Sequence, residues 1–184
     1  MKKIVLLLAI VTLMSFGCSR NPFKSSSSNK AAEAPATLTL ESLKNANYKF
    51  VFKDLADVYN KDSLKLTNGI YYFALPVGAE RAEYLTKLNE NTTAFGDIDG
   101  NGKDDAAAVL TGMAGKNRTY QALVVLLNKN GQAEYTAGVE LEKGVSVESL
   151  SIKDGKIEVT EKAADGKEAK TVRYRTENDN LIQE

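Results

Sequence analysis

The sequence predicts a mainly β protein: a single antiparallel β-sheet domain, built as a meander, a barrel or a sandwich, with a short N-terminal helix. Three observations predict this class. Turn dipeptides recur at short intervals, the segments between them alternate apolar and polar residues, and helical periodicity is scarce. A signal peptide (1–17) and a flexible tether (18–37) are expected to precede the β-rich domain, 38–184.

The elements are expected in chain order, and most are bounded by a turn signal. Residues 40–46 predict the short helix, and Asn68-Gly69 predicts a hairpin within 63–75 because both turn residues tolerate positive φ. The apolar run 120–127 predicts a strand buried on both faces. Roughly eight strands are expected, the later ones at 83–88, 106–112, 118–128, 132–141, 145–152, 156–163 and 170–176. Simple turns are expected at Asn68-Gly69, Asn130-Gly131, Asp154-Gly155 and Asp165-Gly166.

The composition limits the chemistry available to the chain. The sequence contains no histidine, no tryptophan and one cysteine. Histidine is the side chain best suited to proton transfer near neutral pH, so Ser-His-Asp and Cys-His catalysis and histidine-ligated zinc are excluded. Basic and acidic residues number 24 each, and this balance does not predict a nucleic-acid partner. A hydrolase that uses only carboxylates stays compatible with this composition.

Residues 1–18 have the order of a secretory signal. Lys2 and Lys3 come first, the apolar run 4–14 follows, and small residues precede Cys18. The apolar run is shorter than the roughly 20 residues that a membrane-spanning helix needs. One interpretation is an ordinary cleaved signal in which the cysteine is incidental.

The other interpretation is lipidation. Ser15-Phe16-Gly17-Cys18 resembles a bacterial lipobox, although Ser15 stands where an aliphatic residue is usual. The resemblance implies that Cys18 carries a lipid and begins the mature chain, and that Ser19 permits export to an outer membrane. A membrane-anchored lipoprotein of the cell envelope is therefore expected, in the outer membrane and facing the periplasm.

The tether is identified by its composition. Residues 19–37 are rich in serine, alanine, asparagine and proline. Such a segment buries too little apolar area to offset its conformational entropy. About 20 residues of flexible chain span on the order of 25 Å.

The segment FGDIDGNGKDDAAAVL, residues 95–110, carries the strongest chemical signal of the β-rich domain. Acceptor groups alternate along it, which lets a curled loop direct them inward. Three carboxylates in one short loop repel one another unless a cation is bound, so a structural calcium ion is expected. The predicted ligands are Asp97, Asp99, Asn101 and Asp105 through their side chains and Lys103 through its backbone carbonyl.

Two resemblances bear on this loop. It departs from an EF-hand because Ala108 stands where the bidentate glutamate belongs. It is similar to the FG-GAP calcium hairpin of integrin-like propellers, although Asn101 replaces one aspartate and the motif occurs once. Residues 64–176 resemble a family of uncharacterised bacterial lipoproteins with a Gly-Asp-x-(Asp/Asn)-Gly-(Asp/Asn)-Gly-x-x-Asp-Ala-Ala centre. That resemblance implies one domain around the loop and no particular activity.

Two further groups of residues are weaker candidates for a functional site. Tyr71, Tyr72 and Phe73 could form a ligand platform, but aromatic residues in a strand usually pack in a core. A basic patch could form from Lys116, Arg118, Arg173 and Arg175, although a solvated strand face is the simpler interpretation.

The sequence therefore predicts a non-catalytic envelope lipoprotein anchored through Cys18. Its β-rich domain is expected to bind or support an envelope protein or glycan, with calcium in a structural role. The alternative is a metal-assisted hydrolase that uses Asp97, Asp99 or Asp105.

Overall fold

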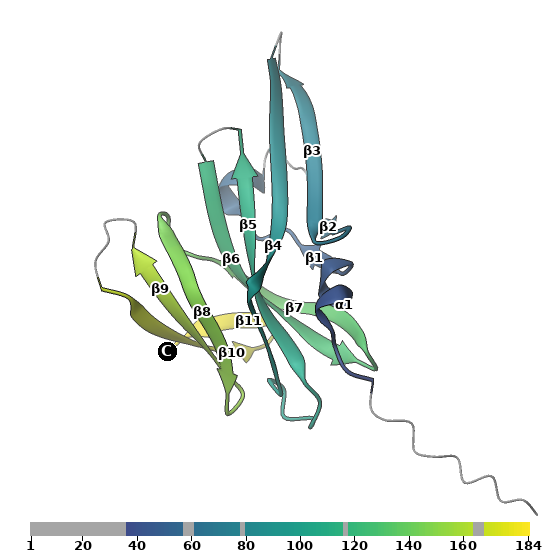
Figure 1. Ribbon diagram of the computed structural model, residues 1–184, viewed down its shortest axis with the longest axis vertical. Helices are drawn as coiled ribbons and strands as arrows, with labels where there is room; N and C mark the ends of the chain where they lie inside the picture. Colours follow the sequence, from purple (N-terminus) through teal and green to yellow (C-terminus); the bar gives the residue numbers. More distant parts are fainter. Residues whose placement is uncertain (1–35, 57–60, 78–79, 116–117, 164–167) are drawn as a thin grey trace, which may run out of the picture. The chain divides into compact units, whose positions relative to one another are not determined.

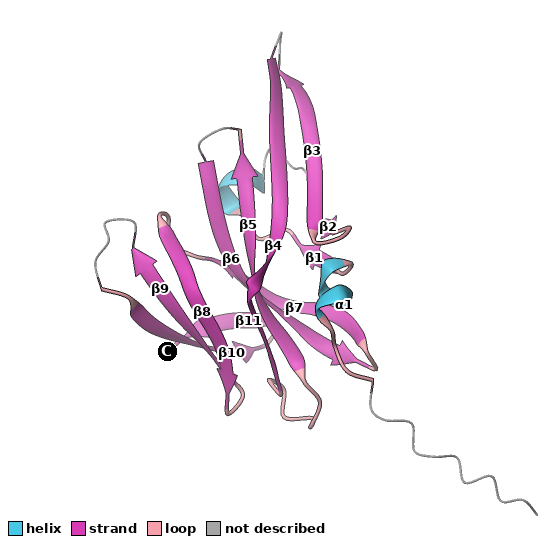
Figure 2. Ribbon diagram, viewed as in Figure 1, coloured by secondary structure: helices cyan, strands magenta, loops and turns pink. Residues whose placement is uncertain are grey.

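The computed structural model describes residues 36–56, 61–77, 80–115, 118–163 and 168–184. All of them belong to the unit Glu33–Glu184. These residues are mainly in strands (Figures 1 and 2). The helical elements are the α-helix α1 (Leu40–Lys44) and the 3-10 helix η1 (Lys53–Leu55). The strands are β1 (Asn47–Lys49), β2 (Ser63–Lys65), β3 (Ile70–Val77), β4 (Glu80–Gly96), β5 (Asp105–Ala114), β6 (Arg118–Lys129), β7 (Gln132–Glu140), β8 (Val145–Lys153), β9 (Lys156–Ala163), β10 (Lys170–Glu177) and β11 (Asn180–Gln183).

The described strands form three antiparallel sheets. One sheet has the order β3-β4-β5-β6-β7, a second has the order β11-β10-β9-β8, and β1 pairs with β2. In the two larger sheets every strand pairs with its neighbour in the chain, as short connections favour. The predicted antiparallel meander is confirmed.

Helix α1 follows from its capping residues. Thr39 precedes the helix in an extended conformation, and its side chain accepts a hydrogen bond from the Ser42 N–H while the Ser42 side chain accepts one from the Thr39 N–H. Leu43 is the buried residue of the helix, and the backbone of Asn45 leaves the helical region. The predicted short helix is confirmed, and it ends at Lys44 rather than at Ala46.

Strands β5 and β6 are buried on both faces and separate two hydrophobic cores. Ala108, Leu110 and Val124 face a first core, which also contains residues of α1, β1 and the segment before β3. Leu123 and Val125 face a second core, which also contains apolar residues of β9 and β10. Alternate residues of one strand point to opposite faces, so these strands need apolar side chains at nearly every position. The predicted doubly buried strand is confirmed.

Strand β4 belongs to the five-stranded sheet and also contacts the four-stranded sheet. Its pairing with β5 shifts between Asn89 and Thr93, so β4 carries a bulge that increases the local bend. Beyond the bulge, β4 contacts β8, and β7 contacts β11, so the two sheets enclose the second core. The contact is close at Gly96, where a Cβ atom would lie 2.9 Å from Ile152 Cγ2.

Two strand assignments differ from the prediction. Asn68 and Gly69 have φ values of 51° and 81°, and Thr67 bridges Ile70, so the tight turn is present. However, β2 pairs with β1 rather than with β3, because the two strands on either side of this turn belong to different sheets. The described residues contain eleven strands, whereas the sequence predicts roughly eight, and β1 and β11 lie outside the predicted strand ranges. Asp165-Gly166 lies outside the described residues.

Candidate metal centre

The acidic loop, residues 97–105, connects β4 to β5 at one end of the five-stranded sheet. Gly100 and Gly102 have φ values of 77° and 78°, a left-handed conformation that lets the loop curl tightly. The curl brings the carboxylates of Asp97, Asp99 and Asp105 together, with one oxygen of each within 4.8 Å of the others. Three of the four predicted side-chain ligands therefore converge.

Asp97 organises the tip of the loop. Its Oδ1 accepts hydrogen bonds from the N–H groups of Gly100 and Asn101, at 2.8 and 3.0 Å. Its Oδ2 accepts another from the Gly102 N–H, at 2.8 Å. One carboxylate thus holds three successive backbone amides, and the sequence places it directly after β4 so that the strand fixes its position.

Asp105 lies at the base of the loop and is fully buried. Its Oδ2 accepts hydrogen bonds from the N–H groups of Ile98 and Asp99, at 3.0 and 3.3 Å. Its Oδ1 accepts one from the N–H of Asn128 in β6, at 2.8 Å. Asp105, the first residue of β5, therefore ties the start of the loop to β6, a structural role that the spacing of acceptors does not reveal.

These backbone donors change the electrostatic argument for a cation. Seven hydrogen bonds from backbone N–H groups reach the three carboxylates. Backbone N–H dipoles directed at an anion stabilise its charge. The repulsion among the carboxylates is therefore partly offset by the loop itself. Lone pairs remain on each carboxylate, because an ionised carboxylate offers about four acceptor sites.

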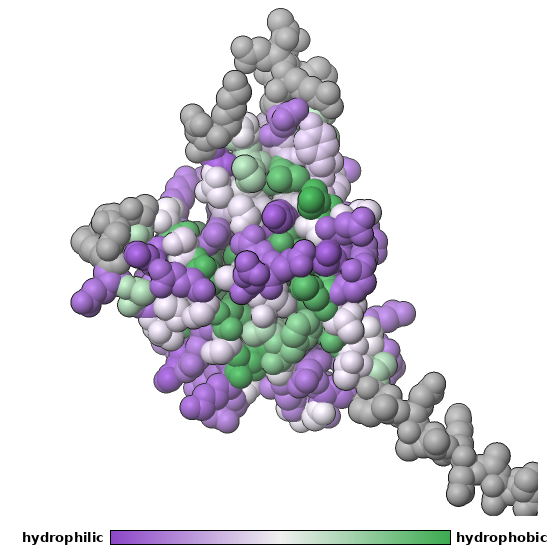
Figure 3. Space-filling view, in the orientation of Figure 1, coloured by the Kyte–Doolittle hydropathy of each residue, from purple (hydrophilic) through white to green (hydrophobic). Residues whose placement is uncertain are grey.

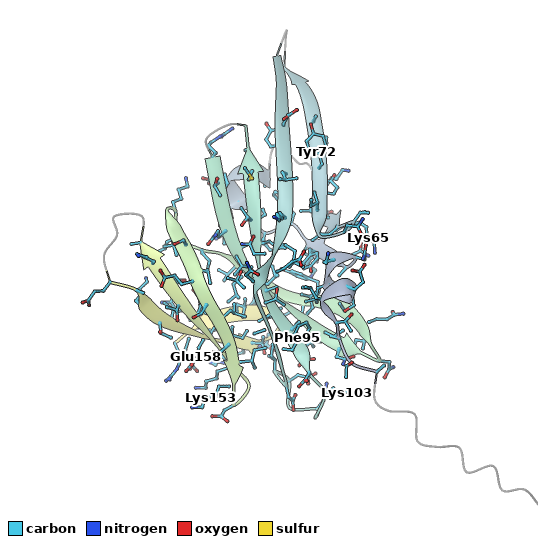
Figure 4. All side chains as sticks on the ribbon, viewed as in Figure 1. Lys65, Tyr72, Phe95, Lys103, Lys153 and Glu158 are labelled. Carbon is cyan, nitrogen blue, oxygen red and sulfur yellow. The ribbon has the colours of Figure 1, made fainter. Side chains whose placement is uncertain are left out.

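The other two predicted ligands lie on the exposed rim of the loop. The Asn101 Oδ1 accepts a hydrogen bond from the Lys103 N–H, at 2.8 Å. The Lys103 amine, near the end of the loop in Figure 4, donates to Asn130 Oδ1 at 3.2 Å. Asn101 is exposed, and Lys103 is half-buried. Their ligation of a metal stays a prediction.

Sequence reasoning missed Asn128. This residue is only 3% exposed, and its side-chain amide donates to the carbonyls of Ala36 and Asp104 at 3.0 and 3.2 Å. Its Oδ1 accepts the Gly131 N–H at 2.7 Å. A polar residue at the end of an otherwise apolar run was the available signal, because a buried amide needs hydrogen-bonding partners.

The sequence predicts a simple turn at Asp154-Gly155, and the structure places this turn beside the acidic loop. The two turn residues have positive φ, as expected. Together with Ile152 they line an open hollow of about 580 Å³ whose other wall is residues 96–100, including Asp97 and Asp99. Three carboxylates, those of Asp97, Asp99 and Asp154, therefore line this hollow, and only the packing of β8 on β4 brings Asp154 there.

The surface around the hollow is mixed in polarity. Figure 3 shows apolar residues beside polar ones in the lower part of the view, and Figure 4 labels Phe95, Lys103 and Lys153 in the same part. Phe95 is 39% exposed. The hollow itself is lined by carboxylates and by the aliphatic side chains of Ile98 and Ile152.

The remaining candidates have structural surroundings. Tyr71 and Phe73 pack against the first core, whereas Tyr72 is 52% exposed and donates to Glu83. The core interpretation is therefore confirmed for two of the three aromatic residues. Arg173 binds Glu158 at 2.8 Å through two nitrogens, and Arg175 pairs with acidic side chains, so these two arginines lie on a mixed-charge face. Lys116 lies outside the described residues.

The predicted signal peptide, most of the tether and Cys18 lie outside the described residues. Within the part of the chain that is described, no helix is long and apolar enough to cross a membrane. Comparison with family models, curated proteins and solved structures found no match. The resemblances to an FG-GAP hairpin and to a lipoprotein family thus stay predictions.

Proposed function

We propose that this chain is a lipid-anchored protein of the cell envelope whose β-domain acts by binding or supporting a partner rather than by catalysis. The position of Cys18 carries the proposal. The one cysteine of the chain follows a signal-like segment, directly after Gly17. Acyl chains on that cysteine would bind the membrane at about 0.8 kcal/mol per buried methylene.

The spacing between the anchor and the domain supports this proposal. Seventeen residues, 19–35, separate Cys18 from Ala36, the first residue that the structure describes. A flexible chain of that length has a root-mean-square span of about 20–25 Å. The β-domain would therefore reach a protein or glycan partner close to the membrane, in the outer membrane and on its periplasmic face.

The anchor is tested by intact mass and by a conservative variant. The mature chain is expected to begin at Cys18 and to carry the mass of its acyl chains. Cys18→Ser is expected to stay unacylated and to leave the membrane fraction, while its β-domain melts at the same temperature as that of the native protein. A native chain that begins elsewhere, or that is unacylated at Cys18, would refute the proposal.

The acidic loop is proposed to hold a structural calcium ion. Its support is the convergence of Asp97, Asp99 and Asp105 within 4.8 Å, together with the alternating acceptors in the sequence. Calcium at ten times its dissociation constant should stabilise the fold by about 1.4 kcal/mol. The test is thermal unfolding with chelator and with added calcium.

Matched variants make the calcium test specific. Asp97→Asn is expected to abolish the calcium-dependent rise in melting temperature, whereas Asp104→Asn, at an exposed neighbour, is expected to keep it. Magnesium at the same concentration serves as the ionic-strength control. An absent shift, or an equal shift in Asp97→Asn, would reject the site.

The open hollow favours one alternative, a metal-assisted hydrolase. Asp99 is exposed, and it lines the hollow beside Asp97 and Asp154. A screen against glycan and phosphoester substrates separates the two functions. Activity that Asp99→Ala abolishes without lowering the melting temperature would replace the binding proposal with the enzyme.

A further inference from the structure

We infer that Asn128 couples the point where the chain enters the β-domain to the acidic loop, so that these two regions open together. The first part of the connection is a pair of hydrogen bonds from the Asn128 side chain. The buried Asn128 amide donates one hydrogen bond to the Ala36 carbonyl and one to the Asp104 carbonyl, at 3.0 and 3.2 Å. Ala36 lies at the domain entrance, and Asp104 lies in the acidic loop.

The second part of the connection runs through Asp105. The backbone N–H of Asn128 donates to Asp105 Oδ1 at 2.8 Å. The other oxygen of the same carboxylate accepts hydrogen bonds from the N–H groups of Ile98 and Asp99. Asp105 is fully buried. The Asn128 side chain and backbone N–H, together with the Asp105 carboxylate, therefore link the entrance to the start of the acidic loop.

The entrance is fixed by packing as well as by hydrogen bonding. A Cβ atom on Gly131 would lie 2.7 Å from the Ala36 Cβ, and Gly131 has a φ of 85°. Gly131 also donates its N–H to Asn128 Oδ1, at 2.7 Å. Leu38, two residues after Ala36, is 6% exposed and belongs to the first core. Displacing the entrance would therefore break contacts with Asn128 and with its turn.

Coupling follows from the burial of these polar groups. If Ala36 moves away, a buried N–H of Asn128 loses its acceptor, and an unsatisfied buried donor is costly. The Asn128 side chain then leaves its position at lower cost, and its departure breaks the hydrogen bond to the carbonyl of Asp104, the residue that precedes Asp105. Thermodynamic linkage is reciprocal, so anything that stabilises the loop also stabilises the entrance. This mechanism requires neither a bound cation nor a lipid.

Hydrogen–deuterium exchange on the full chain tests the coupling, with chelator present so that no cation contributes. The readouts are the amides of Ile98 and Asp99, which donate to Asp105. Leu38→Ala loosens the entrance. Leu43→Ala is the matched control, because it truncates a leucine of the same core within α1. Each result is compared at equal global stability, measured by urea unfolding.

Leu38→Ala is expected to lower the protection of both loop amides by about fivefold more than Leu43→Ala does, which corresponds to one hydrogen bond. In an Asn128→Ala background, this excess is expected to disappear. If that background does not fold, Asn128→Ser replaces it, because one short hydroxyl cannot reach two carbonyls. An excess that persists without Asn128, or that is absent in the native background, overturns the inference. Failure of the calcium or lipid proposals would leave this result unchanged.

Discussion

Replacing Asp105 with asparagine tests whether the acidic loop is held together by its own backbone donors. The substitution keeps the size of the side chain and changes one acceptor oxygen into an NH2 group that cannot accept. If the amide nitrogen takes the Oδ1 position, the Asn128 N–H loses its acceptor. If it takes the Oδ2 position, the N–H groups of Ile98 and Asp99 lose theirs. The first orientation leaves fewer donors without an acceptor and should therefore be adopted.

The magnitude follows from that orientation. One buried N–H without an acceptor costs about 1–3 kcal/mol. The two remaining hydrogen bonds change from charge-assisted to neutral, which weakens each by about 1 kcal/mol. Asp105 is fully buried in the folded protein, so this loss falls on the folded state. The free energy of unfolding should fall by about 3–5 kcal/mol.

Urea unfolding of the full chain with chelator measures this loss without any contribution from a cation. Asp104→Asn is the matched control, because it makes the same chemical change at an exposed adjacent position. It should change the free energy of unfolding by less than about 0.5 kcal/mol. A loss below about 1 kcal/mol for Asp105→Asn, or one equal to that of the control, would refute the structural role of this carboxylate.

Other predictions concern packing and ionisation. Gly96→Ala should lower the free energy of unfolding by about 1–3 kcal/mol, because the added Cβ would lie 2.9 Å from Ile152 Cγ2. The loss should be smaller in an Ile152→Ala background, where this contact is removed. Equal losses in the two backgrounds of a double-mutant cycle would contradict the contact. Leu123→Ala should lower the free energy of unfolding by about 2–5 kcal/mol, because the residue is fully buried in the second core. Burial raises the pKa of Tyr135 and of Tyr174 from 10 to about 12. Stability from these neutral phenols is complete below pH 10 and is lost as pH rises through about 12. Ultraviolet titration should show a delayed phase that Tyr174→Phe reduces, and a single phase near pH 10 would contradict it.

The sheet order was largely predictable because local signals specify it. Asn130 and Asp154 adopt the left-handed conformation that their turn dipeptides predict. Each such turn pairs the two strands that flank it, which fixes the sequential meander of both larger sheets. The apolar run in β6 likewise predicts its own burial, since both of its faces meet hydrophobic cores.

The pairing of β2 could not be predicted from the same signals. A tight turn follows it at Asn68-Gly69, and this pattern normally indicates a hairpin between the flanking strands. In the structure, Tyr48 of β1 pairs with Leu64 of β2, and both side chains are buried in the first core. Long-range burial therefore outweighs the local signal, because the short β2 gains more from this core than from extending the hairpin.

The acidic loop shows a different limit of sequence reasoning. Acceptor spacing correctly predicts that Asp97, Asp99 and Asp105 converge. It does not show which donors face them, because backbone N–H groups have no signature in a sequence. It also does not bring Asp154 to the hollow, since that contact depends on the packing of β8 against β4.

The backbone donors alter what a calcium titration can reveal. If nothing else offset their repulsion, the clustered carboxylates would need a cation, and the loop would unfold locally without one. The observed N–H groups supply part of that neutralisation, with three donors on Asp97 and three on Asp105. A loop organised in this way needs little rearrangement when calcium binds, so loop amides should stay protected under chelator while added calcium raises the melting temperature. If chelator instead exposes the amides of Gly100 and Gly102 to rapid exchange, the cation and not the backbone holds the loop.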